Sequence, residues 1–156
     1  MSRETLSSLG HLLPLPLAAI LLFLLVAPGG VQPLQPSVPD AKKEILGVIQ
    51  AQFEALRQGD YAQAHSFAAA GLRQQFSVAA FERMVKEGYP IIAFWRALSF
   101  GEVEDNGHEA VVEISVLSRR GRIHVFRYLL LREASGWRIN GVLELPGRNA
   151  ERGQLA

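Results

Sequence analysis

Residues 122–142 read RIHVFRYLLLREASGWRINGV and decide the fold, because they contain two runs with the alternation of β-strands. The runs are joined at Glu133–Gly136, which predicts a hairpin. In the first run one face carries Ile123, Val125, Leu129 and Leu131, interrupted by Arg127, and the other carries His124, Phe126, Tyr128 and Leu130. Since both faces are largely apolar, this strand is expected inside a sheet, with the core on one side and a partly covered pocket or a partner surface on the other.

The second run and the segments before it extend the same pattern. Strict alternation places Trp137, Ile139, Gly141, Leu143 and Leu145 on one face, and Arg138, Asn140, Val142 and Glu144 on the other. Two earlier strands are predicted over residues 96–104 and 109–117, joined by a turn at Asn106–Gly107. A further turn at residues 119–121 leads into the first run. Because all the connections are short, we predict an antiparallel meander of four strands.

The first half of the domain has a helical period instead. One apolar stripe comprises Ile45, Val48, Ile49, Phe53 and Leu56. This helix is expected to start near Ser37 and Asp40 and to end at Gly59. Asp60 can cap a second helix over residues 61–69, and residues 70–76 look like a break. Ser77 can cap a third helix that ends at Gly88, since Pro90 prevents its continuation.

Three helices followed by four strands predict an α+β domain in which the N-terminal helices pack on a curved antiparallel sheet. This domain is expected over residues 40–146, followed by a disordered tail over 147–156. Residues 30–39 are rich in Pro and Gly and are interpreted as a linker.

The N-terminal segment has no charged residue from Leu9 to Ala27. Small residues follow it, which is typical of a signal peptide cleaved after Gly29. An uncleaved membrane anchor is the alternative, because the apolar segment approaches the length that spans a bilayer. A domain helix is a third interpretation. The first two place the domain outside the cytoplasm, as a periplasmic or extracellular protein or as one anchored to the membrane.

Composition excludes several functions. The 16 basic and 15 acidic residues are dispersed, so no nucleic-acid surface is expected. Without cysteine there is no disulfide, thiol nucleophile or cysteine-based zinc site. No two of the four histidines have metal-ligand spacing, and no phosphate-binding glycine loop is present, so neither a metal nor a cofactor is predicted.

Six residues are candidates for the lining of a pocket. His65 could be a general base, but a hydrogen-bonded helix histidine is the simpler interpretation, since no acidic partner is evident. His124 and Tyr128 share a strand face, which alternation alone also produces. Arg96 beside Trp95 could bind an acidic ligand or only cover the sheet edge, and Tyr89 could point into a pocket or fill the core. The candidates are His65, Tyr89, Trp95, Arg96, His124 and Tyr128.

Four motifs carry a resemblance to a known family: GLRQQFS, FERMVKEGYP, LSFGEV and GWRINGV. In this order, over Ala41–Leu145, they resemble the bacterial family DUF4864, a domain of unknown function. More distantly, the helical opening and the sheet ending in GWRI resemble the nuclear-transport-factor-2-like superfamily, which includes SnoaL-like cyclases and steroid isomerases. That resemblance implies a cone-shaped α+β fold with a pocket, and frequently a dimer packed through the sheet. The enzymes of the superfamily use inward Asp, His or Tyr side chains, but no Asp-His pair is found on these strands.

The expected function is non-catalytic binding of a small apolar ligand or a protein partner, including a second copy of the chain. The alternatives are a pocket enzyme of the isomerase or cyclase kind, which would use His65 or His124 with Tyr128, and a membrane-tethered envelope scaffold. The enzyme hypothesis requires the chosen His and Tyr to face one cavity.

Overall fold

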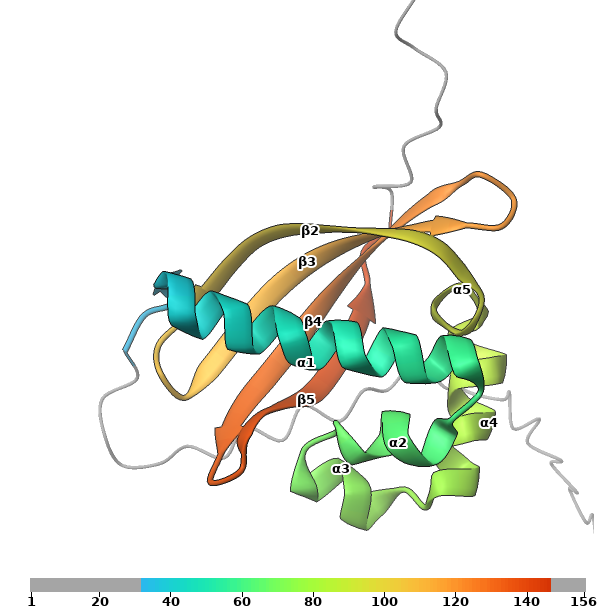
Figure 1. Cartoon of the computed structure of the whole chain (residues 1–156), viewed down its shortest axis with the longest axis horizontal. Helices are drawn as coiled ribbons and strands as arrows, with labels where there is room; N and C mark the ends of the chain where they lie inside the picture. The colour runs from blue at the N-terminus through green and yellow to red at the C-terminus, as the bar shows by residue number, and fades with distance from the viewer. Residues whose placement is uncertain (1–31, 147–156) are drawn as a thin grey trace, which may run out of the picture.

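The computed structural model describes residues 32–146, which form an α+β domain (Figure 1). The leader and the C-terminal tail predicted above lie outside the described residues. The helices are α1 (Pro39–Gln58), α2 (Tyr61–Ser66), α3 (Ala70–Gln75), α4 (Val78–Gly88) and α5 (Pro90–Ala93). The strands are β1 (Gln35–Pro36), β2 (Trp95–Asp105), β3 (Glu109–Ser118), β4 (Ile123–Glu133) and β5 (Gly136–Glu144).

The strands form one antiparallel sheet in the order β1-β2-β3-β4-β5. The predicted four-stranded meander is therefore present, but the described sheet has five strands. The additional strand, β1, consists of two residues that pair with the end of β2. It lies within the segment interpreted as a linker, where three prolines hide any strand pattern.

The three hairpins form at the turns that the sequence indicated. Between β2 and β3, the Asn106 side chain accepts hydrogen bonds from the backbone N–H groups of His108 and Glu109. Gly107 in that turn has a φ of 83°, a conformation that favours glycine. Between β4 and β5, Glu133 pairs with Gly136 across a two-residue turn.

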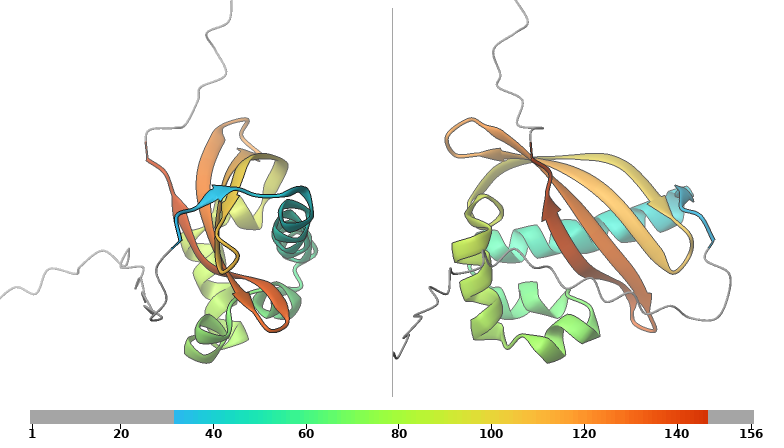
Figure 2. Two further views of the ribbon diagram at one scale, coloured as in Figure 1. Left: turned by 90° about the vertical axis from the view of Figure 1, so that its left-hand side faces the viewer. Right: turned by 180° about the vertical axis from the view of Figure 1, so that it is seen from behind.

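Helix α1 packs on one face of the sheet and supplies one wall of the core (Figures 1 and 2). Its Ile45, Ile49, Phe53 and Leu56 recur at helical spacing and are all buried. The opposing sheet face supplies Ile114, Phe126, Tyr128, Leu130, Trp137 and Ile139, which are also buried. The core thus contains the apolar stripe predicted for the first helix and the face of β4 that begins with His124.

Two helix starts have the predicted caps and one does not. The Asp60 carboxylate accepts a hydrogen bond from the Gln63 N–H at the start of α2, and the Ser77 hydroxyl accepts one from the Ala80 N–H at the start of α4. Helix α1 starts close to Ser37 and Asp40, as predicted, but its N-cap is Val38, which makes no side-chain capping bond. Pro39 is in the first turn of α1. Proline has no backbone N–H, and in the first turn this group would have no partner within the helix, so its absence is not destabilising.

The number of helices also differs from the prediction, with five described instead of three. Residues 70–76 were interpreted as a break, but Ala70–Gln75 form α3, whose first free N–H bonds to the Glu133 carboxylate. This bond comes from β4, 63 positions away in the chain, so no local pattern could indicate it. Helix α4 ends before Pro90, as predicted. Pro90 is also the first residue of the short helix α5, a position where proline is favourable.

A β-bulge in β5 changes which side chains face the core. Leu129 pairs with Gly141 and Leu130 pairs with Ile139, so Asn140 has no partner residue on β4. Strict alternation placed Val142 and Glu144 on the face opposite Trp137, and that prediction is wrong. After the extra residue the phase shifts, so Val142 pairs with Tyr128 and Glu144 pairs with Phe126 on the core face.

Candidate functional site

A histidine–carboxylate pair lies on the core face of the sheet, at the end of β5. His124 Nδ1 is 2.9 Å from Glu144 Oε1. Because a carboxylate only accepts hydrogen bonds, Nδ1 carries the proton of this contact. His124 is 8% exposed, whereas the Glu144 side chain is 46% exposed, so the pair connects the interior with solvent.

The second ring nitrogen, His124 Nε2, is buried and has no hydrogen-bond partner within residues 32–146. In neutral His124, with the proton on Nδ1, Nε2 is an acceptor with an unused lone pair. A carboxylate that orients an imidazole in this way is the arrangement that a general base needs. The pair could therefore accept a proton from a group placed at Nε2.

Two tyrosines belong to the same side of the interior. The Tyr89 hydroxyl, between α4 and α5, donates a hydrogen bond to the Val142 carbonyl at 3.2 Å. Partial burial and the nearby Glu144 carboxylate raise the pKa of Tyr89. Tyr128 is fully buried, and burial, followed by the neighbouring Tyr89, raises the pKa of its hydroxyl. The Tyr128 hydroxyl has no hydrogen-bond partner among the described residues.

Trp95 connects the start of β2 to α1. Its indole N–H donates to the Phe53 carbonyl at 3.1 Å, and the two rings meet edge to face with centroids 6.0 Å apart. The Phe53 ring in turn lies 5.7 Å from the Tyr128 ring. The Arg57 guanidinium lies over the Trp95 ring. Trp95 therefore has the contacts of a packing residue.

His65 and Arg96 lie apart from this group. His65 Nε2 is 2.8 Å from the Phe76 carbonyl, and its ring packs against Phe81 of α4. These contacts fit the interpretation of His65 as a hydrogen-bonded helix histidine. Arg96 is exposed on β2 and forms no ion pair with another described residue.

The structure thus brings three of the six candidates near one another, namely Tyr89, His124 and Tyr128, with Glu144 as an additional member. His124 and Tyr128 lie four residues apart on β4, which corresponds to about 13 Å along an extended strand. Phe126 stands between them on the same face. They do not contact each other directly, and a single substrate would have to extend past Phe126 to reach both.

The second candidate surface is the opposite face of the sheet, which we call the outer face. No described helix covers it (Figure 2). Its residues pair with one another across the strands, Val111 with Leu129, Ser115 with Val125 and Leu117 with Ile123. All of these are only partly buried. The outer face is defined here as Val111, Glu113, Ser115, Leu117, Ile123, Val125, Arg127, Leu129, Leu131 and Leu143.

An ion pair lies in the middle of this apolar surface. The Arg127 guanidinium donates to the Glu113 carboxylate at 2.7 Å across β3 and β4. Arg127 Nε is buried and has no partner among residues 32–146. The outer face therefore combines aliphatic side chains with one neutralised pair of charges and an unused donor.

The described residues offer neither a metal centre nor a transmembrane helix. No group of three or more His, Asp or Glu side chains within residues 32–146 is arranged to hold a metal ion. None of the helices in that range has the length and hydrophobicity needed to cross a bilayer.

Sequence reasoning missed Glu144 as the partner of His124. The only feature of the sequence that could have indicated this pairing is Gly141, because a glycine inside a strand often marks a bulge. A bulge at that point moves Glu144 to the face of His124.

These observations define the class of protein, which is an α+β domain with helices on one face of an open antiparallel sheet. The family model of DUF4864, a domain of unknown function, matches residues 39–152. The chain therefore belongs to the DUF4864 family. No curated protein matches the sequence.

Three solved structures are similar in fold. A SEC-C motif containing protein from Rhodopseudomonas palustris has a TM-score of 0.50 at 13% identity, with 63% of this chain and 76% of that chain covered. A putative dehydratase from the NTF2-like family of Streptomyces avermitilis has a TM-score of 0.48 at 16% identity, covering 67% and 95%. The protein Aln2 from a Streptomyces species has a TM-score of 0.43 at 12% identity, covering 70% and 93%. At these identities the first likeness concerns the fold alone, and the other two are reported only as similarities.

Proposed function

We propose that this domain is a non-catalytic binding module that associates with a second copy of itself through the outer face. The observation that carries the proposal is the apolar character of both faces of β4. One face is buried under α1, whereas the other has no described element packed on it. A partly exposed aliphatic surface of this kind is more stable when a partner covers it.

The outer face is large enough for such an interface. The sheet face that contains these residues also includes β2, and its four strands β2, β3, β4 and β5, at a spacing of about 4.8 Å, give a width of about 19 Å. About nine residues per strand at about 3.3 Å each give a length of about 30 Å. The projected area is then on the order of 600 Å², close to the roughly 800 Å² per partner of a standard interface.

The charges on the outer face favour a copy of the same chain as the partner. Arg127 and Glu113 neutralise each other within one copy, so two such faces meet without net repulsion. In an interface with two-fold symmetry every residue meets the surface that it also presents.

The test is the mass of the full chain measured by native mass spectrometry over a range of concentrations. Val125→Glu adds a charge to the outer face and is expected to convert the dimer to a monomer. Val78→Glu adds the same charge at an exposed position on α4 and should leave the dimer intact. Circular dichroism verifies that both variants are folded. A chain that remains monomeric at all concentrations contradicts the proposal.

A pocket enzyme is the second candidate, because the His124–Glu144 pair leaves Nε2 available for a proton. A catalytic His124 must be reachable by a small molecule in the folded protein. Modification of the native chain with diethyl pyrocarbonate, located by mass spectrometry, tests this requirement. Rapid reaction at His124 supports the enzyme hypothesis, whereas protection of His124 while His108 reacts supports a structural pair.

We also propose that the domain acts outside the cytoplasm, as the apolar segment from Leu9 to Ala27 indicates. The intact mass of the protein from its native host tests this. A chain that begins at Gly30 indicates a cleaved signal peptide, and a chain that begins at Met1 in the membrane fraction indicates an anchor. A full-length chain in the cytoplasm contradicts both.

A further inference from the structure

Four arginines gather at one end of the sheet. Strand β2 starts there, and its pairing with the end of β3 brings Arg96 beside the turn that joins β3 to β4. That turn carries Arg119, Arg120 and Arg122. All four side chains belong to exposed residues, and none of them forms an ion pair with another residue of the described range 32–146.

Hydrogen bonds hold the turn between β3 and β4 in one conformation. The Arg122 carbonyl accepts from the Ser118 N–H at 2.8 Å and from the Ser118 hydroxyl at 3.0 Å. The Gly121 N–H donates to the Ser118 carbonyl, and its φ of 79° favours glycine. The tip of this hairpin projects beyond the helices (Figures 1 and 2). The arginines of the turn are therefore presented to the surroundings on an ordered support.

An exposed aromatic ring lies among these arginines. Phe94, between α5 and β2, is 47% exposed and is the one aromatic residue among the exposed large hydrophobic residues of the described domain. The Arg119 guanidinium lies over its ring, 5.4 Å from the centroid. Aromatic and basic side chains together are typical of surfaces that contact the interfacial layer of a bilayer. We call the set of Phe94, Arg96, Arg119, Arg120 and Arg122 the arginine end, and none of its members belongs to the outer face.

The opposite end of the sheet is acidic. Glu102, Glu104, Asp105 and Glu109 lie where β2 ends and β3 begins, and none of these four forms an ion pair within the described domain. The net charge of the chain is only +1, so it is the separation of charge along the strands that gives the domain a preferred direction. An anionic surface attracts the arginine end and repels the acidic one.

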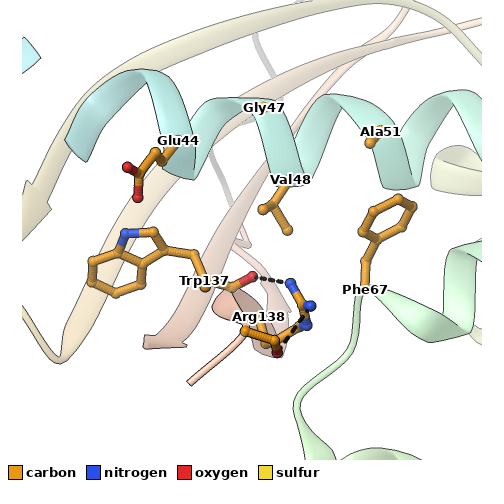
Figure 3. A pocket seen from close by; sticks show the side chains of 9 residues that line it. Glu44, Gly47, Val48, Ala51, Phe67, Trp137 and Arg138 are labelled. Carbon is orange, nitrogen blue, oxygen red and sulfur yellow. Dashed lines mark hydrogen bonds between the residues drawn. The ribbon is translucent and has the colours of Figure 1, made fainter. Parts of the chain in front are cut away.

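The positive charge of the arginine end is not offset by carboxylates of its own. No Asp or Glu occurs in the two paired segments that form it. Glu144, at the neighbouring end of β5, is bonded to His124. By contrast, the hollow between α1 and β5 is lined by both Glu44 and Arg138, so its charges balance (Figure 3).

We propose that the arginine end binds the surface of a membrane that contains anionic lipids. Guanidinium groups donate paired hydrogen bonds to phosphate oxygens, which lipid headgroups supply. The Phe94 ring enters the apolar layer beneath the headgroups, where it is removed from water. An acidic protein segment would also attract the arginines, but it offers no apolar layer for Phe94. A lipid surface therefore fits both features of this end.

The test uses the full chain produced in its native host, so that the leader is in its natural state, and reads out the arginine end alone. The chain has no cysteine, so Arg120→Cys places an environment-sensitive fluorophore at the tip of the turn and Ala79→Cys places one on α4. Vesicles that contain phosphatidylglycerol are expected to brighten the label of Arg120→Cys in a saturable and salt-sensitive way. Vesicles of phosphatidylcholine alone should not, and the label of Ala79→Cys should respond to neither.

Two sets of substitutions in the labelled Arg120→Cys chain separate local charge from total charge. Each arginine near an anionic bilayer contributes about fivefold to affinity, so Arg96→Gln, Arg119→Gln and Arg122→Gln together are expected to weaken binding by about 100-fold. Lys42→Gln, Lys43→Gln and Arg83→Gln remove the same total charge at exposed positions on α1 and α4. This second set should change the affinity by less than about fivefold. Circular dichroism verifies that both sets are folded.

Phe94→Ala distinguishes a membrane from an acidic polypeptide. It should weaken binding to the phosphatidylglycerol vesicles by about fivefold, because part of the apolar contact is lost. A label that responds equally to both kinds of vesicle, or equal affinities in the two sets of charge substitutions, overturns the proposal. A response to poly-L-glutamate without a response to the vesicles overturns it as well and would assign the arginine end to an acidic protein.

Discussion

His124 Nδ1 lies 2.9 Å from the Glu144 carboxylate because a single extra residue, Asn140, shifts the phase of β5. Without the bulge, Glu144 would point to the outer face, and His124 would have no acidic partner on β5. A local irregularity of the backbone thus creates the polar pair at this end of the core.

The first prediction concerns the tautomer of His124. Since the Glu144 carboxylate accepts the Nδ1 proton, neutral His124 is expected to carry its hydrogen on Nδ1. Long-range ¹H–¹⁵N correlation spectra distinguish the two tautomers through the ¹⁵N shifts of the ring. Glu144→Ala should remove the preference, whereas Glu104→Ala, on the distant strand β2, should not alter it. A hydrogen on Nε2 in the wild-type chain would disprove the contact.

The two neighbouring tyrosines should respond in opposite ways to removal of the hydroxyl. Tyr128→Phe deletes a buried hydroxyl without a partner and is expected to increase the free energy of unfolding by about 1–3 kcal/mol. Tyr89→Phe deletes the hydrogen bond to the Val142 carbonyl and should lower it by about 1 kcal/mol. Urea denaturation of the two variants and the wild type measures both changes. A loss of stability in Tyr128→Phe would mean that the hydroxyl has a partner.

Alkaline pH should destabilise the domain through the same residues. Burial raises the pKa of Tyr128, and to a smaller degree that of Tyr89, so the folded chain keeps protons that the unfolded chain releases above a pH of about 10. The stability from this effect is complete below that pH. Above it the stability falls by up to about 1.4 kcal/mol per pH unit for the fully buried Tyr128, and by less for Tyr89, which solvent reaches. Thermal unfolding between pH 8 and pH 12 measures the slope. Tyr128→Phe should have a shallower slope, and an identical slope in this variant would contradict the assignment.

Two glycines at the middle and the end of α1 form a matched pair. Gly47→Ala is expected to stabilise the domain by about 1 kcal/mol, because the helix interior favours alanine and the added methyl group meets no atom. Gly59→Ala should destabilise it by a similar amount, because Gly59 has a φ of 73° at the helix end. Chemical denaturation compares the two. Changes of the same sign would show that the conformation of α1 differs from the one described.

Local signals in the sequence predicted most of the sheet and the longer helices. The alternation from Ile123 to Leu131 divided β4 into two apolar faces without indicating which of them is the core face, and Asn106–Gly107 identified a hairpin. Gly59, Asp60 and Ser77 marked helix ends correctly because capping depends on nearby residues. The pattern of β5 was predicted correctly only up to Ile139.

Features that depend on distant contacts were not predictable in the same way. Helix α3 is only six residues long and starts at an N–H that is bonded by Glu133 of β4. Strand β1 consists of Gln35 and Pro36, which have no strand pattern of their own. The alternation of β5 indicates that Trp137 is a core residue, but it does not show which groups surround the indole. Only the structure shows that the indole N–H of Trp95 has an acceptor and that of Trp137 has none among the described residues.

The central claim is that the outer face binds a second copy, and a single introduced cysteine tests it most directly. The chain has no cysteine, so Ser115→Cys places one thiol on the outer face and Ala79→Cys places one on the exposed surface of α4. A short bismaleimide cross-linker should convert most of Ser115→Cys to a covalent dimer at low protein concentration and should leave Ala79→Cys monomeric. Cross-linking of Ala79→Cys to the same extent, or no dimer of Ser115→Cys, would contradict association through the sheet.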